Sequence, residues 1–123
     1  MKNSDFDLDL KFGKEGENTV ANLLSIETVE VKRDARWKDT GNLYIETECW
    51  YNASQSWEPS GLSVSKSTHY AFVLEGMVVI TTTEDLKVVT ANKGRPIECK
   101  IEPNPSKGFL IKLSDIVEHQ INV

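Results

Sequence analysis

Polar and apolar residues alternate in two neighbouring segments of the chain, residues 28–34 and residues 42–50. Successive side chains of a β-strand point to opposite faces, so both segments are predicted to be half-covered strands. Between them, residues 39–42 read Asp-Thr-Gly-Asn, which is typical of a turn. We therefore expect the two strands to pair as an antiparallel hairpin.

This hairpin would gather acidic side chains on one face. Alternation in the second strand places Tyr44, Glu46 and Glu48 together. In the first strand Asp34 shares a face with Lys32, so pairing would bring Asp34 near Glu46 and Glu48. The solvated side of a half-covered sheet has a similar composition. The other face of the second strand is apolar and should pack on a helix: Leu43, Ile45 and Thr47.

The same criteria predict elements in the rest of the chain. Residues 14–26 carry an apolar stripe at helical spacing, formed by Val20, Leu23 and Leu24. The remaining predictions are strands at 69–74 and 77–82, a helix capped by Thr83, a brief strand at 97–101, a strand at 108–113 and a helix capped by Ser114. A chain of 123 residues supports one domain. The prediction is a single α/β or α+β domain over residues 1–123.

Composition limits the function. A net charge of −5 argues against a protein that coats nucleic acid, because such binding uses Lys and Arg to neutralise phosphates. The densest basic and aromatic cluster follows the first strand and is a candidate DNA contact, although a solvated loop would look the same: Arg33, Arg36, Trp37 and Lys38. Trp57, in the polar loop at 51–61, is a further candidate and would equally suit the edge of a small core.

Cysteine and histidine usage points away from a soft metal site. Cys49 and Cys99 stand far apart, and His69 and His119 are the only histidines, so any metal should be held by oxygen. No apolar run approaches the ~20 residues of a membrane span, and residues 1–10 lack the features of a signal peptide. We expect a cytoplasmic protein without a membrane partner, in the host cytoplasm if a phage encodes it.

The spacing of Asp34, eleven intervening residues, Glu46 and Glu48 resembles the PD-(D/E)XK nuclease signature, in which an Asp and a Glu on adjacent strands hold a divalent cation. The resemblance covers roughly residues 13–82. It implies a restriction-endonuclease-like fold, a mixed β-sheet flanked by helices, and a metal-site role for Glu17 in the first predicted helix. An acidic residue there would also complement the helix dipole.

Two residues depart from the signature. No Pro precedes Asp34, which affects only the backbone. Glu48 stands where a Lys normally orients or activates the attacking water, and Lys32 and Lys66 are the candidates to replace it.

The resemblance implies a DNA endonuclease dependent on Mg²⁺ or Mn²⁺, of the homing, site-specific or junction-resolving type. Asp34, Glu46 and Glu17 would be metal ligands, with Glu48 and a lysine completing the site. The expected partners are duplex or branched DNA and a second copy of the chain, since cutting two strands takes two sites.

Two alternatives stay open. The chain would be a non-catalytic nucleic-acid-binding protein if it retained the nuclease fold without cleavage. A shifted register would make Glu30-Val31-Lys32 the motif, with Asp9 or a neighbour supplying the Asp. Asp39 is a weaker substitute for Asp34, because it lies within the predicted turn.

Overall fold

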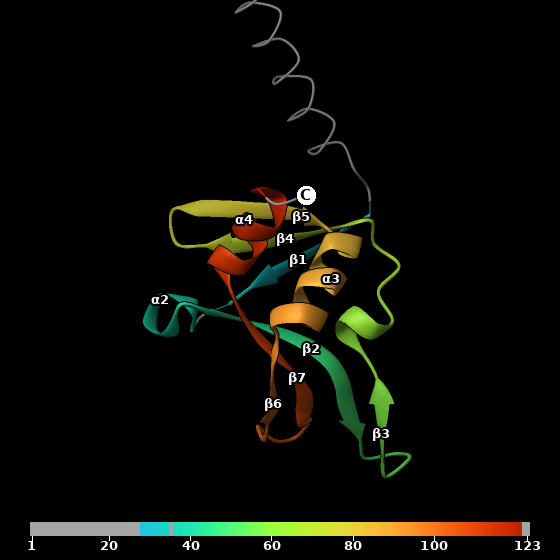
Figure 1. Cartoon of the computed structure of the whole chain (residues 1–123). Helices are drawn as coiled ribbons and strands as arrows, with labels where there is room; N and C mark the ends of the chain where they lie inside the picture. The colour runs from blue at the N-terminus through green and yellow to red at the C-terminus, as the bar shows by residue number, and fades with distance from the viewer. Residues whose placement is uncertain (1–27, 35, 122–123) are drawn as a thin grey trace, which may run out of the picture.

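A computed structural model describes residues 28–34 and 36–121, which form an α+β domain (Figure 1). Within these residues, a three-stranded mixed sheet and a four-stranded antiparallel sheet are accompanied by three α-helices. In chain order the elements are β1 (Val29–Arg33), α2 (Trp37–Thr40), β2 (Asn42–Tyr51), β3 (Ser56–Pro59), the 3₁₀ turn η1 (Gly61–Ser63), β4 (His69–Leu74), β5 (Met77–Thr82), α3 (Thr83–Lys93), β6 (Arg95–Cys99), β7 (Ser106–Lys112) and α4 (Leu113–Ile121).

The first sheet has the order β1-β4-β5, so the predicted hairpin between residues 28–34 and 42–50 is wrong. β1 runs parallel to β4, with Val31 opposite Ala71, and β5 returns antiparallel to β4. The intervening residues do not form a tight hairpin turn. They form α2, which ends where the Gly41 N–H donates to Trp37 O at 2.7 Å and Gly41 adopts a φ of 73°. The chain then enters the second sheet.

The second sheet has the order β3-β2-β7-β6 and contains a β-bulge in β2. Glu46 lies opposite Gly108 and Glu48 lies opposite Lys107, so Thr47 is an extra residue in the ladder. Directly paired residues share a face, whereas the neighbours Lys107 and Gly108 point to opposite faces. Glu46 and Glu48 therefore lie on opposite faces, and the predicted shared face is wrong.

Both sheets contribute to one hydrophobic core. Leu43 and Ile45 of β2 are buried, as their predicted apolar face requires, and they meet Tyr70 and Phe72 of β4. The remaining buried apolar members of this core are Leu62, Leu74, Leu86, Val89, Ile111 and Ile116. Figure 1 shows α3 and α4 in front of β4 and β5, and α3 packs on α4. The core therefore fixes β1 and β4 relative to β2.

Several predicted boundaries are confirmed and others shift. The strands at 69–74 and 77–82 are confirmed. The cap of α3 is Thr82, not Thr83, because Thr82 Oγ1 accepts from Asp85 N at 3.1 Å. β6 and β7 each begin two residues before their predicted starts, and β3 forms within the predicted loop. The predicted helix at 14–26 lies outside the described residues. None of the described helices is long and apolar enough to cross a membrane.

Candidate functional site

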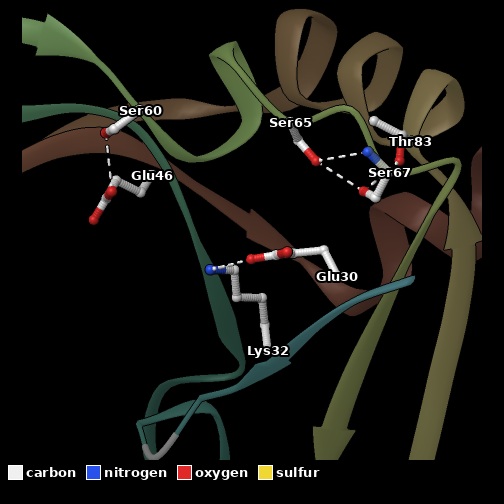
Figure 2. A network of polar contacts seen from close by, with 7 residues as sticks. All are labelled: Glu30, Lys32, Glu46, Ser60, Ser65, Ser67 and Thr83. Atoms are coloured by element: carbon white, nitrogen blue, oxygen red, sulfur yellow. Dashed lines mark hydrogen bonds and ion pairs between the residues drawn. The ribbon is translucent and has the colours of Figure 1, made fainter. Parts of the chain in front are cut away.

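Lys32 and Glu46 line one small pocket between the two sheets. Lys32 comes from β1, whose inner face carries Glu30 and Lys32 because they stand opposite Tyr70 and Phe72 of β4. The floor of the pocket is apolar, and its cavity of about 10 Å³ has room for roughly one water molecule. Both residues border this space, while the Glu46 carboxylate is bonded to Ser60 and points away from Lys32 (Figure 2).

The segment after β3 holds Glu46 in place (Figure 2). Ser60 is buried, and its Oγ donates to Glu46 Oε2 at 2.9 Å while its N–H donates to Thr47 O at 2.9 Å. Gly61 lies directly against the Glu46 backbone: a Cβ at Gly61 would stand 2.3 Å from Glu46 O, and its φ is +52°. Only glycine fits this position. Sequence reasoning did not identify Ser60 or Gly61, and the turn sequence Pro-Ser-Gly was the available signal.

Asp34 reaches β2 through its carboxylate. Oδ2 accepts from Tyr44 N at 3.0 Å, and Oδ1 accepts from Arg36 N at 2.9 Å. Tyr44 and Glu46 share a face of β2 and are two residues apart, a separation of roughly 7 Å along a strand. Asp34 therefore contacts β2 through a side-chain bond to the Tyr44 backbone and not through strand pairing.

Glu30 and Lys32 form an ion pair at 3.1 Å on the inner face of β1, visible in Figure 2. Each side chain is 45% exposed, and an exposed pair of this kind contributes little to stability. Breaking this ion pair would therefore cost little stability. The pair also keeps the shifted register open, although Asp9, which that register needs, lies outside the described residues.

Glu48 lies among different neighbours. Its partner Lys107 places its Nζ 4.1 Å from the ring centroid of Trp57, and Trp57 meets Trp50 edge to face with centroids 5.7 Å apart. Trp57 is thus half-buried in a local cluster of aromatic and charged side chains. The structure does not bring Glu48 or Trp57 to the Glu46 pocket.

The other predicted site residues are dispersed. Trp37 packs against the core, and Lys38 pairs with Glu75 at 3.4 Å. Arg33 and Arg36 are exposed. Lys66 lines a separate, wider groove beside Ser65 and the start of α3, and Glu17 lies outside the described residues. The predicted basic cluster is therefore a mixture of packing and surface residues.

Tyr44 extends the polar environment of Glu46. Its hydroxyl hydrogen-bonds to Ser106 Oγ at 2.7 Å. Burial raises the pKa of Tyr44, and the nearby Glu46 carboxylate raises it further, so the phenol stays protonated at neutral pH. Cys49 and Cys99 each pair with Ser106 in the sheet register, and both are free thiols.

The acidic side chains of the described residues do not form a closed metal cage. Among the described residues, no three His, Cys, Asp or Glu side chains converge as metal ligands would. Mg²⁺, however, is often bound through one or two carboxylates together with waters and substrate phosphates.

Comparisons of the chain with protein-family models, curated proteins and solved structures give no match. The nuclease resemblance therefore rests on the sequence motif alone.

Proposed function

We propose that the chain is a Mg²⁺-dependent endonuclease that hydrolyses DNA phosphodiester bonds at the Lys32 and Glu46 pocket. The observation that carries this proposal is that Lys32 of β1 and Glu46 of β2 line the same pocket. Asp34 is bound to the β2 backbone two residues from Glu46, which provides a second carboxylate. A restriction-endonuclease-like fold is part of the proposal.

Each residue has a role that follows from its position. Glu46 and Asp34 would hold the metal ion, and Ser60 positions Glu46 through its hydrogen bond. The ion, when bound, supplies a water of lowered pKa and stabilises charge on the phosphate oxygens. Lys32 is partly exposed and would place a cation beside a phosphate bound outside the small pocket, where such a charge favours the developing anion.

The proposed substrate is duplex or branched DNA, cut by a homodimer that carries one site in each copy. Exposed Arg33, Arg36 and Lys38 follow the C-terminal end of β1 and could neutralise phosphates next to the site. The sequence contains no helix-turn-helix or zinc-finger motif that reads bases. Target choice would then depend on DNA shape or on dimer geometry.

The test is single-turnover cleavage of labelled linear, nicked and four-way-junction DNA with Mg²⁺, Mn²⁺ or EDTA. Glu46→Gln keeps the size of the side chain and removes its charge, so cleavage should fall by orders of magnitude while the fold persists. Glu48→Gln is the matched control, because Glu48 lies on the opposite face of β2 and should retain wild-type activity. Full activity in Glu46→Gln would refute the site.

A non-catalytic DNA-binding protein is the second candidate, favoured by the lack of a third converging metal ligand among the described residues. Under this alternative, DNA binding would be detected without cleavage in any metal. Glu30→Gln tests the shifted register in the same assay. Loss of cleavage in Glu30→Gln together with full activity in Glu46→Gln would move the catalytic acid to β1.

A further inference from the structure

Two cations lie on the same face of the β3-β2-β7-β6 sheet as Glu46. In the ladder between β2 and β7, Lys112 stands opposite Asn42 at the start of β2. Arg95 of β6 stands opposite Leu110, which precedes Lys112 by two residues in β7. Directly paired residues share a face, and so do residues two apart in one strand. Glu46, Arg95 and Lys112 therefore share one face, called here the outer face of this sheet.

The helices α3 and α4 lie on the other side of the sheet. Ile111 of β7 points to this inner side and belongs to the hydrophobic core. Leu86 of α3 and Ile116 of α4 are members of the same core. On the outer face, Arg95 and Lys112 are both exposed. The two cations are therefore accessible to a partner.

The two cations have no acidic partner among the described residues. This part of the chain contains four ion pairs, and none of them includes Arg95 or Lys112. Asp115 accepts from the Lys112 backbone N–H at 2.9 Å and not from its ammonium group. Of the ladder residues on the outer face between Asn42 and Glu46, Glu46 is the only acidic one. In a chain of net charge −5, this part of the face is locally positive and complements an anionic partner.

The spacing of the cations suits a chain of phosphates that also passes Glu46. Arg95 and Lys112 are diagonal neighbours across β6 and β7, a separation of about 7 to 8 Å that long side chains can span. Arg95 lies two strands, or about 10 Å, from Tyr44, and Tyr44 is two residues, or about 7 Å, from Glu46. Arg95 is thus roughly 12 Å from Glu46 along the face. One bound polymer can contact all three positions.

We propose that Arg95 and Lys112 bind neighbouring phosphates of a DNA strand that crosses the outer face of the sheet beside Glu46. This inference rests on the proposed function, because DNA is the polyanion that the proposed endonuclease would bind. Arg can hold a phosphate through two hydrogen bonds, and Lys acts as a point charge. Such contacts position the DNA and release counterions without reading its bases. The DNA then lies on the side of the sheet opposite α3 and α4.

Equilibrium binding to a short labelled duplex, in EDTA and over a range of salt concentrations, tests the contacts. Arg95→Gln and Lys112→Gln should each raise the Kd several-fold and lower the slope of log Kd against log salt concentration by about 1. Lys87→Gln is the matched control, since Lys87 is an exposed cation on α3, and this variant should keep the wild-type slope. A purely structural role of the cations would change the Tm and leave the slope unchanged. Slopes of Arg95→Gln and Lys112→Gln equal to that of Lys87→Gln would overturn the proposal.

A parallel cleavage assay in Mg²⁺ separates this inference from the proposed function. If the wild type cleaves DNA while the two variants keep its salt slope, the endonuclease stands and the path over Arg95 and Lys112 is wrong. If the variants lower the slope but the wild type does not cleave, the path stands and the endonuclease is wrong. Absence of DNA binding by the wild type, even at low salt, would overturn both.

Discussion

The two sheets of the domain differ in how their strands are brought together. The β3-β2-β7-β6 sheet is antiparallel throughout, and two of its three strand pairs join strands that are consecutive in the chain. In the β1-β4-β5 sheet, β1 pairs in parallel with β4, so Val31 meets a residue forty positions later. Parallel pairing needs a crossover connection of roughly a dozen residues or more, which no local turn signal marks. Local turn chemistry can therefore predict the first sheet's β4-β5 hairpin but not the partner of β1.

The difference matters because the candidate site lies between the sheets. Lys32 belongs to one sheet and Glu46 to the other, so neither sheet alone forms the pocket. Outside the shared apolar core, polar or close backbone contacts also connect the parts, among them Gly61 against Glu46, Asp34 on Tyr44, and Asp85 with α4. Removing each contact by substitution tests how one part of the domain is held to the next.

The largest effect is expected at Gly61. Gly61→Ala puts a Cβ 2.3 Å from Glu46 O and strains a φ of +52°, so η1 must move away from β2. We expect a loss of about 2 to 4 kcal/mol in the free energy of unfolding, measured by urea denaturation. The second sheet would then lose its contact with the segment that leads to β4.

Gly41→Ala is the matched control for this prediction. Gly41 also has a positive φ, of +73°, but a Cβ there would meet nothing within 4 Å. It should cost only about 1 kcal/mol, the price of the backbone conformation alone. Equal losses at the two glycines would show that the close approach of Gly61 to β2 does not matter.

The sequence predicted local elements well and their assembly poorly. Alternation identified the buried Leu43 and Ile45, and the apolar runs at 69–74 and 77–82 matched β4 and β5 to the residue. The bulge at Thr47 could not be predicted, because it depends on the β2 and β7 ladder and has no local sequence signal. One extra residue was enough to separate Glu46 from Glu48.

The same reasoning applies to the candidate site. The alternation of polar and apolar residues in their strands identified Glu46 and Lys32 as candidates. The structure places both residues at one pocket and does not test their role. Ser60 was missed because its partner is fourteen residues earlier in the chain. The sequence motif included Lys66 and Glu48 as candidates. In the fold, Lys66 lines a different groove and Glu48 lies on the opposite face of β2.

A smaller effect is expected at Asp34, whose carboxylate connects the end of β1 to β2. Asp34→Asn removes the charge that strengthens the hydrogen bonds from Tyr44 N and Arg36 N. The free energy of unfolding should fall by about 1 to 2 kcal/mol in thermal or urea denaturation. Asp39→Asn is the control, since the exposed Asp39 side chain makes no hydrogen bond or ion pair with any described residue. A similar loss in both variants would rule out the proposed role of Asp34 in joining the sheets.

The smallest effect concerns Asp85, which joins α3 to α4 on the side of the core shared by both sheets. Asp85 Oδ2 accepts from Gln120 Nε2 at 2.9 Å, and Oδ1 lies 3.1 Å from His119 Nε2. The hydrogen bond from Gln120, followed by that from His119, lowers the pKa of Asp85 below its usual value. Its stabilisation is therefore present above the unfolded pKa of about 3.9 and is lost as pH falls through the lower folded pKa.

Asp85→Asn should consequently reduce the free energy of unfolding near pH 6 by less than about 1 kcal/mol, because the side chain is partly exposed. The difference from the wild type should shrink as the pH is lowered below about 4, when the wild-type carboxyl also becomes neutral. Urea denaturation from pH 3 to pH 6 measures this, with Glu84→Gln as the control for charge in the first turn of α3. A difference that does not change with pH would show that the Asp85 charge has no part in holding α3 to α4.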